Sequence, residues 1–146
     1  MKVQRLNVGG LVIALVTITL LTGCFGGVAS AECEEVEPWL AATADRNERF
    51  AEEFEVVAAK FDDGCITQED FRAAIQKMDE ATTAHARSNP PPAAAPMNAL
   101  FVDALERYTD LMVTASNGGN ADTRAADSVL QRAKEADAAL REQCGL

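Results

Sequence analysis

The chain has 146 residues and a formal net charge of −10 at pH 7, and 48% of its residues are hydrophobic. Lys2 and Arg5 are the only charged residues before Glu32, so the remainder carries 11 basic and 23 acidic residues. Such an acidic surface repels phosphate backbones, which argues against nucleic-acid binding, and the apolar content is too high for a disordered chain. After removal of an export segment, the length suits one ordinary domain.

The first predicted element is an export segment. Lys2 and Arg5 give a positive start, and residues 11–21 (LVIALVTITLL) form an apolar run of signal-peptide length that is short for a membrane span. The sequence Leu21-Thr22-Gly23-Cys24 follows and resembles the lipobox of bacterial lipoproteins. The resemblance implies that residues 1–23 are removed and that the Cys24 thiol receives a diacylglyceryl group. Acyl chains such as palmitate then hold the protein in membrane lipid, on the outer face of the cell membrane.

Two alternatives to the lipid anchor remain open. Ala29-Ser30-Ala31 is an A-x-A site where ordinary signal peptidase can cut, which releases a soluble secreted form that begins at Glu32. Residues 6–31 carry no charge and, left uncut, are long enough to span a bilayer. We favour the anchor because a cysteine directly follows the apolar run in an L-T-G-C context. Residues 24–34 are then the lipidated cysteine with a flexible tether, and residues 35–146 form the domain.

The remainder shows helical rather than strand-like spacing of its apolar residues. Thr67 is a predicted helix N-cap followed by acids, and the prolines at 90–92 must interrupt any helix. Four helices are predicted, over about residues 35–60, 68–88, 96–116 and 122–143. The linker at 89–96 spans at most about 25 Å as polyproline II, too short to cross the full length of the bundle. The sequence therefore predicts an all-α, antiparallel up-down-up-down four-helix bundle.

The third predicted helix has a wider apolar arc than one core face requires. We therefore expect Val102 and Val113, together with Trp39 at the start of the first helix, as a candidate surface for a protein partner. For Trp39, packing at the end of the bundle is the favoured interpretation.

Three cysteines remain if Cys24 is lipidated. In the predicted topology the start of the first helix and the end of the fourth lie at the same end of the bundle. We therefore predict a disulfide between Cys33 and Cys144, which export favours. Cys65 falls in the first turn, at the far end, and its state is left open.

The sequence predicts no enzyme. No nucleophile-elbow serine or glycine-rich phosphate loop is present, so no catalytic residue, cofactor or metal site is predicted. His85 is the only histidine and is interpreted as structural. The predicted function is a membrane-anchored, extracytoplasmic lipoprotein that acts as a non-enzymatic interaction or envelope-structure module. The alternative is a lipoprotein that binds a small ligand or metal ion, between helices or where Cys33, His85 and Cys144 lie.

Overall fold

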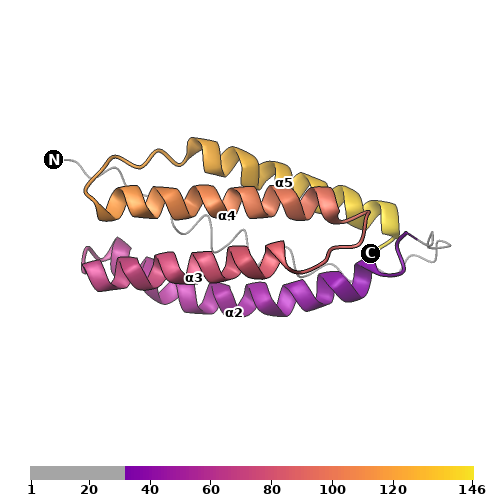
Figure 1. Ribbon diagram of the computed structural model, residues 1–146, viewed down its shortest axis with the longest axis horizontal. Coiled ribbons are helices and arrows are strands. Elements are labelled where there is room, and N and C mark those ends of the chain that lie inside the picture. Colours follow the sequence, from indigo (N-terminus) through magenta and orange to yellow (C-terminus); the bar gives the residue numbers. More distant parts are fainter. Residues whose placement is uncertain (1–31) are drawn as a thin grey trace.

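The computed structural model describes residues 32–146 and folds them into four helices (Figure 1), which are α2 Val36–Asp62, α3 Gln68–Ala86, α4 Ala95–Ser116 and α5 Arg124–Cys144. Cys24 and the predicted signal segment lie outside the described residues. The described part contains no strand, and successive helices run in opposite directions along the bundle. The predicted all-α, up-down-up-down four-helix bundle is therefore confirmed.

The helices do not pack equally closely. α4 packs closely against both α3 and α5, whereas α2 packs mainly against α3 and does so less closely. Small residues on the facing surfaces of α4 and α5, Ala104, Ala126 and Ala133, are almost fully buried and let these two helices approach. On α2 the corresponding positions are Phe50 and Phe54, whose large stacked rings hold the helix backbones further apart.

Local sequence explains where α2 ends and where α3 begins. Gly64 has a φ of +68°, and the next N–H, of Cys65, donates to the Lys60 carbonyl at 2.9 Å, which closes the last turn of α2. Thr67 then caps α3, since its hydroxyl accepts from the Asp70 N–H while the Asp70 carboxylate accepts from the Thr67 N–H. The predicted turn and the predicted N-cap are both confirmed.

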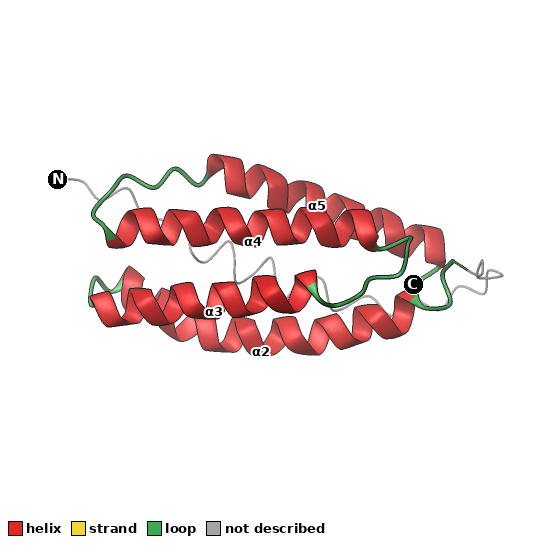
Figure 2. Cartoon of the chain, viewed as in Figure 1, coloured by secondary structure: helices red, strands yellow, loops and turns green. Residues whose placement is uncertain are grey.

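The helix boundaries differ from the predicted ones by about two residues at several ends. α5 begins at Arg124 rather than Asp122, because the Asp122 carboxylate accepts the Arg124 N–H at 3.1 Å and so stands before the helix. α3 ends at Ala86, earlier than predicted, because the N–H and the hydroxyl of Ser88 both turn back to the His85 carbonyl. The linker then reaches α4 at the same end of the bundle (Figure 2).

The interior consists of two apolar clusters. The larger cluster draws on all four helices and is built around Met78, Leu105 and the two stacked phenylalanines. The smaller cluster lies at the end that holds both chain ends of the domain, and it comprises Val36, Leu40, Ala94, Met97 and Leu140. None of the helices in residues 32–146 is long and apolar enough to cross a membrane.

A layer of buried polar residues lies between the two apolar clusters. In α2, α4 and α5 the polar residues stand in sequence between members of the smaller and the larger cluster, and in α3 they follow the larger one. We call these residues the polar layer: Thr43, Asn47, Thr82, His85, Asn98 and Asp137. Each helix contributes to the polar layer, and hydrogen bonds from His85 to Asn47 and Asn98 join α2, α3 and α4 within it.

Candidate functional site

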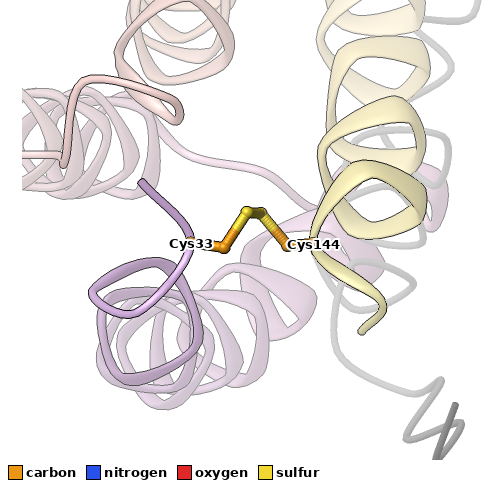
Figure 3. Close-up of a disulfide and its surroundings, with 2 residues drawn as sticks. All are labelled: Cys33 and Cys144. Atoms are coloured by element: carbon orange, nitrogen blue, oxygen red, sulfur yellow. A yellow bond between two sulfur atoms is a disulfide. The ribbon is translucent and has the colours of Figure 1, made fainter. Parts of the chain in front are cut away.

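A disulfide joins the two ends of the domain. Cys33, just before α2, is bonded to Cys144, the last residue of α5, with the Cα atoms 5.4 Å apart (Figure 3). This separation falls in the ordinary range for a disulfide. The predicted pairing is confirmed, and its cause is the topology: an even number of alternating helices returns the chain to the end where it started.

The disulfide removes two candidate metal ligands from this end of the bundle. It uses both thiols, so Cys33 and Cys144 provide no thiolate for the zinc site considered from the sequence. Across residues 32–146, no three His, Cys, Asp or Glu side chains are grouped closely enough to hold a metal ion. The exposed glutamates at 32, 34, 35 and 37 surround this end and make it strongly acidic.

His85 is the centre of the polar layer. Its side chain is buried, its ring packs against Phe101, Nδ1 lies 3.2 Å from the Asn98 Oδ1 and Nε2 lies 2.7 Å from the Asn47 Oδ1. Burial lowers the pKa of His85 to about 4, with the nearby Arg46 guanidinium acting in the same direction and the Asn98 hydrogen bond opposing it. The ring is therefore neutral at pH 7, as expected for a structural histidine.

A neutral imidazole has one N–H, so it can donate to only one of the two amide oxygens. Asn98 is fixed, because its own amide nitrogen donates to the His85 carbonyl at 3.1 Å, which assigns the ring proton to Nδ1. Nε2 of the neutral ring is then an acceptor, and the Asn47 amide satisfies it with its nitrogen in place of its oxygen, since the two orientations of an amide have the same shape.

Asp137 is the one carboxylate of the polar layer. The residue is 6% exposed, and its Oδ2 accepts from the Arg141 Nε at 2.9 Å, one helical turn further along α5. Among the described residues, no hydrogen-bond donor reaches its Oδ1. A buried carboxylate with one unsatisfied oxygen costs stability, and Arg141 supplies a compensating positive charge.

A groove runs along the surface between α2 and α3, beside the polar layer. Its volume is about 320 Å³, and its lining residues are Arg46, Asn47, Arg49, Phe50, Glu53, Lys77, Glu80, Ala81, Ala84 and His85. Phe50 and the two alanines give it an apolar floor, and five charged side chains form its walls. No sequence pattern indicated this groove, because its lining residues come from two separate helices that only the fold brings together.

The three residues predicted for a partner surface lie apart from one another. Trp39 is half-buried against the smaller apolar cluster, and its indole N–H donates to the Ser88 carbonyl at 3.2 Å, so it packs at the end of the bundle. Val102 and Val113 lie on one face of α4, three turns apart, and Glu106 and Asp110 are exposed between them. Val113 is 40% exposed, while Val56 on α2, which the sequence analysis did not single out, is 61% exposed.

Cys65 lies at the opposite end of the bundle from the disulfide. It is exposed and free, and its Sγ is 3.6 Å from the Asp63 carbonyl oxygen. The predicted position in the turn between the first two described helices is confirmed.

Comparisons of this chain with protein-family models, with curated proteins and with solved structures gave no match.

Proposed function

We propose that this protein is an extracytoplasmic lipoprotein that is anchored through Cys24 and acts by non-enzymatic contact with a protein or envelope partner. The observation that carries the proposal is the Cys33–Cys144 disulfide. Disulfides persist in oxidising compartments and are rare where thiols are kept reduced. A disulfide that closes the whole domain therefore supports export, which is the same address that the lipobox resemblance implies.

The short distance in sequence between Cys24 and the first residue of the described domain indicates which end of the bundle faces the membrane. Cys24 precedes Glu32 by eight positions, so a fully extended tether reaches about 30 Å at most. Glu32 adjoins the disulfide, which makes the end with Cys33 and Cys144 the base of the anchored domain. The exposed glutamates at this base repel anionic headgroups and favour an extended tether.

Among the side chains that the structure describes, the two most exposed large apolar ones favour the opposite end for contact with a partner. Val56 lies near the end of α2 and Val113 near the end of α4, both far from Glu32 along the bundle. Exposed valines are among the side chains that lose unfavourable hydration when a partner covers them. A partner approaching from outside the membrane would reach this end first.

The state of His85 supports a non-enzymatic role. Both ring nitrogens are occupied by amide groups, and a pKa of about 4 keeps the ring neutral at pH 7. A general acid or base works best with a pKa near the operating pH, and the pKa of His85 lies well below pH 7. Turnover of any substrate that depends on His85 would contradict this part of the proposal.

The anchor is tested by replacing Cys24 with serine in the full chain and fractionating the cells that produce it. We expect the unchanged chain in the detergent phase of the membrane fraction and the Cys24→Ser chain without acyl chains. Cys65→Ser is the matched control, because it removes the other cysteine outside the disulfide and should stay in the membrane. A soluble product that begins at Glu32, or an unchanged chain recovered from the membrane without acyl chains, would refute the lipid anchor.

The partner contact is tested by placing a photo-crosslinking residue at Val113 and, as a control, at the exposed Glu135 on α5. We expect a discrete crosslinked product in the native membrane from position 113 and none from position 135. Identical products from the two positions, or no product from position 113, would contradict contact at the far end of the bundle.

A further inference from the structure

The groove between α2 and α3 is a candidate site for a small ligand, and this inference does not depend on the lipid anchor. It exists because α3 presents small side chains, Ala81 and Ala84, opposite a row of long side chains on α2. Phe50 completes the apolar floor and belongs to the larger apolar cluster. The groove therefore combines an apolar floor, which can hold the body of a ligand, with charged walls, which can fix its orientation.

The charges along the groove are separated by sign. Two contacts between α2 and α3 mark the two ends of the groove. At one end the Arg46 Nη1 donates to the Ala84 carbonyl at 2.8 Å, and at the other end the Lys77 Nζ lies 2.7 Å from a Glu53 carboxylate oxygen. Lys77 also lies 3.9 Å from Glu80, so its charge is shared between two carboxylates. One end of the groove is thus positive, through Arg46 and Arg49, and the other carries one net negative charge.

Both arginines are held in place without a carboxylate partner. Arg46 is fixed by the carbonyl of α3, and Arg49 donates its Nε to the Asp45 carbonyl of its own helix at 3.2 Å. Among the side chains that the structure describes, no carboxylate lies within ion-pair distance of either guanidinium. Residues three apart on a helix are neighbours, so the two guanidinium groups can converge on one anion.

We propose that this groove binds a small organic carboxylate, with the carboxylate on Arg46 and Arg49 and the apolar body on Phe50, Ala81 and Ala84. The negative end of the groove repels the carboxylate and directs it toward the arginines. The volume of about 320 Å³ is at the small end for ligand sites, which limits the ligand to roughly six to ten carbon atoms.

Charge complementarity favours this ligand over two others. A divalent cation would need carboxylates that are free to coordinate it, and Glu53 and Glu80 are engaged by Lys77. Inorganic phosphate would bind the arginines but would leave the apolar floor uncovered. A short alkyl carboxylate and the C-terminal carboxylate of a peptide share the required chemistry, so the test includes one of each.

The test uses the full chain in non-ionic detergent at pH 7. His85 lines the groove and is the only histidine, so its ring carbon–hydrogen NMR signals report ligand binding without ambiguity. The probes are hexanoate, acetyl-leucine as a peptide terminus, hexanamide as the neutral counterpart of hexanoate, and inorganic phosphate. We expect saturable shifts with millimolar dissociation constants for one or both carboxylates, and binding at least about tenfold weaker for hexanamide and phosphate.

Two groove variants and one control test the assigned contacts. Arg49→Gln removes an exposed charge whose only described hydrogen bond lies within its own helix, so α2 should remain intact. We expect it to weaken carboxylate binding about tenfold, since a charge-assisted hydrogen bond is lost. Ala81→Leu fills the groove and should abolish binding, with the helical circular dichroism spectrum checking its fold. Arg132→Gln, on the exposed side of α5, is the matched control and should bind normally.

Several outcomes would overturn the proposal. No saturable shift of the His85 signals by either carboxylate up to about 50 mM would show that the groove does not bind this class. Equal affinity for hexanoate and hexanamide, or equal losses in Arg49→Gln and Arg132→Gln, would show that the arginines are not the anion contacts. Stronger binding of acetyl-leucine than of hexanoate would support the proposal and identify a peptide terminus as the source of the carboxylate.

Discussion

Removing the disulfide should cost this domain a large part of its stability. The change is the double substitution Cys33→Ser and Cys144→Ser, which replaces each sulfur by an oxygen and leaves Cys65 and the other core residues in place. The bond closes a loop with a sequence separation of 111, which is nearly the whole described chain. Such a bond chiefly restricts the unfolded chain, because it removes many of the extended conformations that this chain could otherwise adopt.

The chain-entropy model gives the size of the effect. A closed loop of about 110 residues corresponds to about 5 kcal/mol at 25 °C. A domain of this length has an unfolding entropy of about 0.24 kcal/mol per kelvin, so the expected drop in Tm is about 20 °C. Small domains have a free energy of unfolding of about 5–15 kcal/mol, so the variant should be only marginally stable at 37 °C.

The assay is thermal unfolding followed by circular dichroism at 222 nm, for the full chain, the double variant and a Cys65→Ser control. We expect the control to match the unchanged chain, and a reducing agent to bring the unchanged chain down to the Tm of the double variant. A double variant within about 5 °C of the unchanged chain would refute the argument, because the closed loop would then contribute little.

Three further predictions concern the polar layer, a helix cap and the core. Because the pKa of His85 falls from 6.5 in the unfolded chain to about 4 in the fold, stability should be complete above pH 6.5 and decrease as the pH falls toward 4. The loss in the free energy of unfolding should be about 3 kcal/mol. Urea unfolding at pH 7 and pH 4.5 should show most of this difference, and the difference should disappear in His85→Gln. Thr67→Ala breaks the capping box of α3 and should cost about 1 kcal/mol in the same assay; no change would contradict the cap. Leu105→Ala, at a residue 2% exposed, should cost about 2–5 kcal/mol, whereas Val113→Ala should cost under about 0.5 kcal/mol. Equal costs for these two variants would contradict the described core.

Much of the fold could be predicted because helix signals are local. Thr67 followed by acids defines the start of a helix, and Gly64 provides the left-handed residue that ends the one before it. The pairing of Cys33 with Cys144 followed from counting helices, because an even number returns the chain to its starting end. These inferences needed only residues near one another in sequence, plus one rule of topology.

The rest depended on contacts between distant helices, which no local pattern encodes. Asn47 lies on the predicted inner face of the first helix, whereas Asn98 was not placed on a predicted core face, and only the packed structure brings both amides to the ring of His85. The groove is equally non-local, since Arg46 reaches a carbonyl 38 positions away. Val56 was missed because it stands beside Val57 in sequence, and a small rotation of α2 decides which of the two is buried.

The lipid anchor is tested most directly by the intact mass of the protein recovered from the membrane fraction of its native host. We expect a chain that begins at Cys24, carries a diacylglyceryl group, lacks two hydrogens for one disulfide and has one alkylatable thiol at Cys65. An uncut chain with an unacylated Cys24, or a product that begins at Glu32 and so lacks Cys24, would contradict the anchor.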